Sequence, residues 1–165
     1  MDSNLPRGMT IMPPIVEVHF DGACQPPHRG VAGYGFVVHG EGLDYSEKGL
    51  AAPPYSETST NNVAEYVGAI RALEYLRKRG FHGQLVLLGD SELVIKKLSG
   101  EYEVRTEHLK AYHRHLMTLL ESFPTARVEW VPREQNEEAD ALSKLAVQEA
   151  AEEARRYQAG RRPLS

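Results

Sequence analysis

The sequence IVEVHFDGAC occupies residues 15–24 and contains the clearest alternating pattern of the chain. Apolar and polar side chains alternate over residues 15–20, which is the pattern of a β-strand with one covered face. Asp21-Gly22 follows, and this pair is common in turns. We therefore expect a first strand that runs into a turn and places the Asp21 carboxylate at the strand end.

Four more segments have strand character. Residues 33–39 and 43–52 flank a Gly-Glu-Gly turn and would complete an antiparallel meander with the first strand. QLVLLG at residues 84–89 is a continuous apolar run, as expected for a strand that is covered on both faces, and it leads directly to Asp90. ARVEWV at residues 126–131 alternates again. Five strands are therefore expected.

Helices are expected between and after these strands. Thr60, Asn61 and Asn62 can cap a helix whose apolar residues recur at helical spacing until Gly80. Other helical segments are residues 91–98, residues 106–123, and a last helix that Asn136 or a neighbour opens and that continues toward Arg155. This order predicts an α/β fold with a five-stranded mixed sheet, three antiparallel strands and then parallel strands, flanked by helices.

Composition limits the class of protein. The 165 residues are 41% hydrophobic and 25% charged, which is typical of one soluble domain. We expect a flexible leader at residues 1–14, one domain at residues 15–150, and a helix extension and tail at residues 151–165. No apolar run approaches a membrane span, no signal peptide is visible, and the single cysteine excludes an internal disulfide. These features favour a cytoplasmic protein. We expect it to be a monomer and to have no membrane partner.

Four acidic residues lie at the junctions of the expected elements: Asp21, Glu65, Asp90 and Asp140. Taken singly, each has a structural explanation, because Asp-Gly is a common turn and Asn62-x-x-Glu65 resembles a helix capping box. If all four converge, their charges would repel one another strongly. Hard carboxylate oxygens of this kind suit Mg²⁺ or Mn²⁺, and a pair of such ions catalyses phosphodiester hydrolysis.

Four sequence segments occur in order over most of the chain: HFDGACQ at 19–25, TNNVAEYVGAIRALE at 60–74, LGDSELVIKKL at 88–98 and VPREQNEEADALSKLA at 131–146. Together they resemble the type 1 ribonuclease H family over about residues 15–150. The resemblance implies the ribonuclease H-like fold and two Mg²⁺ ions, which Mn²⁺ can replace, held by the four acids named above. It also implies endonucleolytic cleavage of the RNA strand of an RNA–DNA hybrid, which leaves 3′-hydroxyl and 5′-phosphate ends.

The same resemblance suggests substrate contacts. It places Gly22, Cys24, Asn61 and Asn62 near the minor groove of the hybrid, with Thr60 as a phosphate ligand. Helix capping explains the Thr-Asn-Asn segment equally well. For Cys24, a small buried side chain without a catalytic role is the favoured interpretation.

The chain departs from many members of this family in two places. The loop before the last helix reads VPREQN at residues 131–136 and lacks their histidine, which is similar to an archaeal-like branch of the family. Arg133 is then the candidate for binding the scissile phosphate, with a surface ion pair to Glu134 as the alternative. The segment at residues 100–106 is short and contains two glutamates, and it lacks the basic protrusion that binds the DNA strand in some relatives.

Two other functions stay open. A non-catalytic module that binds hybrids or RNA would have the same fold, although this chain has lost none of the four acids. A nuclease with double-stranded RNA as an additional substrate would have the same acids. The net charge of −4 means that binding of any nucleic acid depends on local basic residues or on bound cations.

Overall fold

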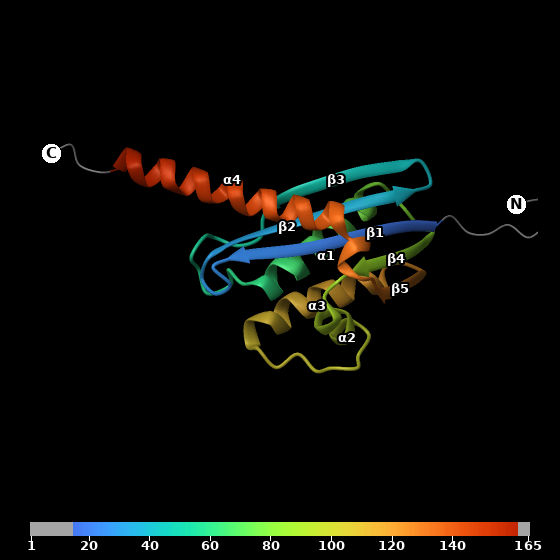
Figure 1. The fold of residues 1–165 in the computed structure, drawn as a ribbon. Coiled ribbons are helices and arrows are strands. Elements are labelled where there is room, and N and C mark those ends of the chain that lie inside the picture. Colours follow the sequence, from blue (N-terminus) through green and yellow to red (C-terminus); the bar gives the residue numbers. More distant parts are fainter. Residues whose placement is uncertain (1–14, 162–165) are drawn as a thin grey trace, which may run out of the picture.

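A five-stranded sheet with the strand order β3-β2-β1-β4-β5 forms the centre of the computed structural model, which describes residues 15–161 (Figure 1). β1 (Ile15–Gln25), β2 (Val31–Gly40) and β3 (Leu43–Leu50) are antiparallel to their neighbours in this set. β4 (Gln84–Gly89) runs parallel to β1, and β5 (Thr125–Trp130) runs parallel to β4. The mixed sheet expected from the sequence is confirmed. The leader predicted at residues 1–14 lies outside the described residues, as do residues 162–165.

The first strand is longer than the sequence pattern predicts. Asp21 is not at the end of β1, because the strand continues to Gln25. The two edges of β1 differ: pairing with β4 ends at His19, opposite Leu88, whereas pairing with β2 continues to Gln25, opposite Val31. β2 thus supplies the hydrogen-bond partners that carry the strand past the Asp-Gly pair. Asp21 still lies just beyond the last β4 partner, so its carboxylate can face the end of β4.

Helices cover both faces of the sheet. α1 (Asn61–Lys78), α2 (Glu92–Leu98) and α3 (Glu107–Glu121) lie on one side, and α4 (Glu137–Arg161) lies on the other (Figure 1). On the first side, Phe20 of β1 packs in a large apolar core with Leu73 of α1 and Leu116 of α3. On the second side, α4 lies close to β2, where a Cβ added at Gly35 would be 2.7 Å from the Ala139 carbonyl oxygen.

The ends of the elements follow from local chemistry. Thr60 is the N-cap of α1, and its side chain accepts a hydrogen bond from the Val63 amide, so the capping box suggested for Asn62 and Glu65 does not form. The hairpin between β2 and β3 turns at Glu41 and Gly42, which both have positive φ angles (51° and 76°). A short 3-10 turn, η1 (Arg133–Gln135), precedes α4, and α4 reaches Arg161 instead of ending near Arg155. No helix in the described part of the chain is long and apolar enough to cross a membrane.

Candidate active site

An open cleft of about 610 Å³ lies where β1 meets the end of β4 and the starts of α1 and α4. All four acids identified from the sequence line it, and so does Arg133. The remaining lining residues are Gly22, Ala23, Cys24, Gln25, Pro27, Asn61, Ser91, Lys144 and Val147. Acids as far apart in the sequence as Asp21 and Asp140, which are separated by 119 positions, therefore share one surface.

Asp21 is the only one of the four acidic residues that is buried as a whole residue, with 7% of its surface exposed. The pKa of Asp21 is raised to about 8, mainly by burial and then by the nearby Asp90 carboxylate, with smaller contributions from Asp140 and Glu65. The Gly22 amide donates a 2.9 Å hydrogen bond to Asp21 Oδ1 and partly offsets these effects. The cluster therefore carries more negative charge than its surroundings compensate.

Glu65 lies near the start of α1, which approaches β1 very closely at this point. A Cβ at Gly22 would be 2.2 Å from the Glu65 amide nitrogen, so the approach requires glycine there. The pKa of Glu65 is raised to about 7, mainly by burial; Ser91 and Lys97 oppose the rise, and Asp90 adds to it. Within the described residues, Glu65 Oε2 is buried and has no hydrogen-bond partner. A buried carboxylate oxygen without a partner is costly unless a ligand satisfies it.

Asp90 follows β4 directly and is held by groups from two other elements. The Asn136 side-chain amide donates to Asp90 Oδ2 at 3.2 Å and to the Phe20 carbonyl oxygen at 3.0 Å. The indole Nε1 of Trp130 donates to the Asp90 carbonyl oxygen at 3.0 Å. Asn136 also opens α4 as expected, because its carbonyl oxygen accepts from the Asp140 amide. The sequence analysis did not predict that the Asn136 side chain would hold the Asp90 carboxylate.

Asp140, in the first turn of α4, has a basic partner that the sequence analysis did not identify. Lys144 Nζ lies 3.0 Å from Asp140 Oδ2, one helical turn further on. The i, i+4 spacing of an acid and a lysine was the available signal. Arg133 is exposed at the rim of the cleft, and within residues 15–161 it forms no ion pair with Glu134 or any other acid.

Only some of the residues expected to contact substrate lie in the cleft. Gly22, Cys24 and Asn61 line the cleft, whereas Thr60 and Asn62 do not. Cys24 is 5% exposed, and its thiol donates to the Pro26 and Ser59 carbonyl oxygens at 3.0 and 3.3 Å. Its side chain is thus engaged within the protein. Asn61 is exposed at the start of α1.

The donor set fits hard divalent cations by its chemistry. It consists of carboxylate oxygens, one of them without a partner, and two of the carboxyl groups have raised pKa values. Among the described residues, however, no three acidic, histidine or cysteine side chains are placed as a preformed metal site. Lys144 and Asn136 instead satisfy one oxygen each of Asp140 and Asp90. A cation bound by Asp140 Oδ2 would have to displace the Lys144 ammonium group.

Sequence comparison identifies related proteins. A family model described as "Reverse transcriptase-like" matches residues 19–146. The bifunctional protein Rv2228c of Mycobacterium tuberculosis is 36% identical over 143 residues, which cover 84% of this chain and 37% of that protein. Ribonuclease HI of Halobacterium salinarum is 37% identical over 136 residues, which cover 82% of this chain and 65% of that protein. The chain thus spans well under half of the mycobacterial relative and about two thirds of the archaeal one.

Solved structures show the same architecture. The N-terminal RNase H domain of Rv2228c, solved as a fusion with maltose-binding protein, has a TM-score of 0.76 at 33% identity, with 86% of this chain and 99% of that one covered. RNase H1 from H. salinarum has a TM-score of 0.70 at 34% identity, with 82% and 98% covered. LC11-RNase H1 in complex with an RNA/DNA hybrid has a TM-score of 0.73 at 29% identity, with 82% and 99% covered.

Proposed function

The chain belongs to the type 1 ribonuclease H family, and we propose that it is an endonuclease that hydrolyses the RNA strand of RNA–DNA hybrids with two divalent cations. The observation that carries this proposal is the convergence of four carboxylates on one cleft, where Glu65 Oε2 is buried and has no hydrogen-bond partner among residues 15–161. The hybrid bound to LC11-RNase H1 supports the choice of substrate. Products with 3′-hydroxyl and 5′-phosphate ends are part of the proposal.

We assign cation binding to Asp21, Glu65, Asp90 and Asp140. Bound Mg²⁺ or Mn²⁺ would supply the hydrolytic chemistry, because divalent cations lower the pKa of water and stabilise charge on a leaving oxygen. With pKa values raised to about 8 and about 7, Asp21 and Glu65 are at least partly protonated in the metal-free protein at neutral pH. Cation binding should therefore release protons from both side chains.

Arg133 and Asn61 are assigned to the substrate. The Arg133 guanidinium is exposed at the rim of the cleft and can bind the scissile phosphate through two parallel hydrogen bonds. Asn61 can donate to and accept from base edges and 2′-hydroxyl groups in the minor groove, which distinguish RNA from DNA. Gly22 and Cys24 border the same surface, and Thr60 and Asn62 would reach substrate only outside the cleft itself.

A panel of duplexes tests this function. End-labelled RNA–DNA hybrid, double-stranded RNA and double-stranded DNA are incubated with the protein in Mg²⁺, Mn²⁺ or a chelator. We expect cleavage of the RNA strand of the hybrid, dependent on a divalent cation, with 3′ ends that a polymerase can extend. Binding of the hybrid without cleavage in either metal would instead favour the non-catalytic module. Equal cleavage of double-stranded RNA would show that selectivity for the hybrid is wrong.

A further inference from the structure

A line of hydrogen bonds connects the Asp90 carboxylate to a histidine outside the cleft. His19 Nδ1 lies 3.2 Å from Asn136 Oδ1, and the Asn136 amide nitrogen donates to Asp90 Oδ2 at 3.2 Å. Asn136 is 1% exposed, so its side chain depends on hydrogen bonds within the protein. Within residues 15–161, His19 forms no hydrogen bond with any of the four acids, and it does not line the cleft.

The orientation of the Asn136 amide follows from its partners. The Phe20 carbonyl oxygen can only accept a hydrogen bond, and so can an ionised Asp90. The amide NH₂ group must therefore face both of them, which leaves Asn136 Oδ1 facing His19. Because Oδ1 only accepts, the hydrogen in this contact belongs to His19, and Nδ1–H donates to Asn136.

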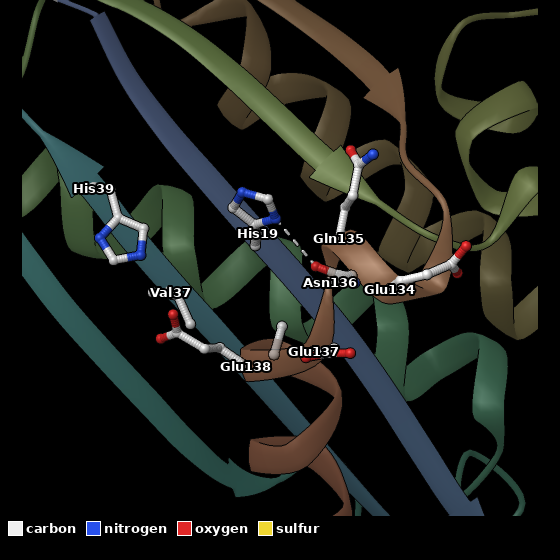
Figure 2. Close-up of a pocket in the computed structure, with 9 residues that line it drawn as sticks. His19, Val37, His39, Glu134, Gln135, Asn136, Glu137 and Glu138 are labelled. Atoms are coloured by element: carbon white, nitrogen blue, oxygen red, sulfur yellow. Dashed lines mark hydrogen bonds between the residues drawn. The ribbon is translucent and has the colours of Figure 1, made fainter.

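A separate cavity of about 240 Å³ lies beside this contact, between β1, β2 and the start of α4. Figure 2 shows His19 and His39 on its walls, with a dashed line only from His19 to Asn136. His39 instead lies 3.5 Å from Asp44, at the end of the β2–β3 hairpin. The two histidines thus line one cavity, but only His19 contacts a residue that holds Asp90.

We propose that His19 is a positioning residue: by fixing the Asn136 amide, it holds the Asp90 carboxylate in the orientation that binds a divalent cation. The proposal rests on the proposed function only in assigning cation binding to Asp90. Without the Nδ1–H donor, Asn136 Oδ1 would be buried and unsatisfied. The Asn136 side chain would then be held only by the two hydrogen bonds of its NH₂ group, so it could shift and move the Asp90 carboxylate with it.

Two substitutions at residue 19 separate hydrogen bonding from packing. His19→Phe keeps a ring and removes the donor, whereas His19→Asn places an amide nitrogen near the position of Nδ1. His39→Phe is the matched control, because His39 lines the same cavity from the neighbouring strand β2. The Mg²⁺ dissociation constant is measured by calorimetry on each metal-free protein, and kcat and KM are measured on an RNA–DNA hybrid.

We expect His19→Phe to raise the Mg²⁺ dissociation constant about tenfold and to lower kcat, with little change in KM for the hybrid. His19→Asn should restore most of the affinity, and His39→Phe should match wild type. If His19→Phe binds Mg²⁺ as wild type does, or if His19→Asn is as impaired as His19→Phe, the proposal is overturned. Mg²⁺ binding by a wild-type protein that cleaves no duplex would contradict the proposed function, while the dissociation constants would still decide the role of His19.

A measurement on the unmodified protein covers the case in which His19→Phe does not fold. Long-range ¹⁵N–¹H correlation spectra distinguish the two neutral tautomers of histidine. The proposal requires a hydrogen on His19 Nδ1 in the folded protein. A bare Nδ1 with the hydrogen on Nε2 would overturn it.

Discussion

At the scale of single residues, the site brings together carboxylates whose negative charges repel one another. Asp90 raises the pKa values of both Asp21 and Glu65, and burial raises them more. Buried acids with raised pKa values often belong to functional sites, where a bound ligand stabilises their charged form. Without cations, the four carboxylates should therefore reduce stability.

The pH dependence of stability follows from these shifts. The folded pKa of Asp21 (about 8) lies above its ordinary value of 3.8, and that of Glu65 (about 7) lies above 4.5, so the folded protein binds more protons than the unfolded chain between these limits. The stabilisation that these two groups contribute to the folded protein is fully present below about pH 4 and is lost as the pH rises toward 8. We expect the free energy of unfolding of the metal-free protein, measured with urea, to fall over this range. The fall should be smaller in Asp21→Asn, and an equal fall in both proteins would contradict the assignment.

Arg133 gives a second prediction at this scale. Arg133→Ala removes the bidentate phosphate contact and should lower kcat/KM on the hybrid about tenfold, with Arg133→Lys intermediate. Arg127→Ala is the control, because Arg127 is a β5 residue that pairs with Glu129 at 2.6 Å and does not line the cleft. Cleavage by Arg133→Ala at the wild-type rate would leave this side chain without a role in the reaction.

Sequence patterns located the four acids but not the residues that hold them. Asp90 follows a strand and Glu65 and Asp140 lie near helix starts, which periodicity reveals, whereas Asp21 lies inside β1, just past its last β4 partner. Asn136 and Lys144 act through side chains whose partners lie in space, and their sequence positions are equally compatible with helix capping and with a solvated helix face. Their roles as partners of Asp90 and Asp140 became visible only with the tertiary structure.

At the scale of elements, the site depends on how closely α1 approaches β1. The strands and helices expected from periodicity are present, and the two largest differences in length are in β1 and α4. Pairing with β2 extends β1 beyond the Asp-Gly pair, and α4 extends to Arg161. The extension of β1 could not be predicted from the local sequence pattern, because it depends on pairing of residues 21–25 with another strand, β2.

Gly22→Ala tests the approach of these two elements. The added Cβ would meet the backbone of Ala64 and Glu65, so α1 must move away from β1. We expect the free energy of unfolding to fall by about 1–3 kcal/mol, as for other overpacked sites. Mg²⁺ affinity should fall as well, because Glu65 moves relative to Asp21. Gly160→Ala, where no atom lies within 4 Å of the added Cβ, should leave both quantities unchanged. Wild-type Mg²⁺ affinity in Gly22→Ala would contradict the importance of this contact.

At the scale of the whole molecule, the net charge of −4 gives no general attraction for nucleic acid. Two basic residues, Arg133 and Lys144, line the cleft. If both neutralise phosphates, the logarithm of the association constant for a hybrid should fall with the logarithm of salt concentration with a slope of about −2. Lys144→Ala should make the slope shallower by about one, as measured by fluorescence anisotropy. A slope steeper than about −4 would show basic contacts outside the cleft.

Cleavage of a labelled RNA–DNA hybrid in Mg²⁺ by wild type and Asp90→Asn, measured side by side, tests most directly whether the carboxylates form a catalytic site. Wild type should cut the RNA strand, and Asp90→Asn should be slower by at least about 100-fold, since it loses a cation ligand. Without metal, the variant should unfold at a temperature equal to or above that of wild type, because a repulsive charge is gone. Similar cleavage by both proteins, or no cleavage of any hybrid by wild type, would contradict the account.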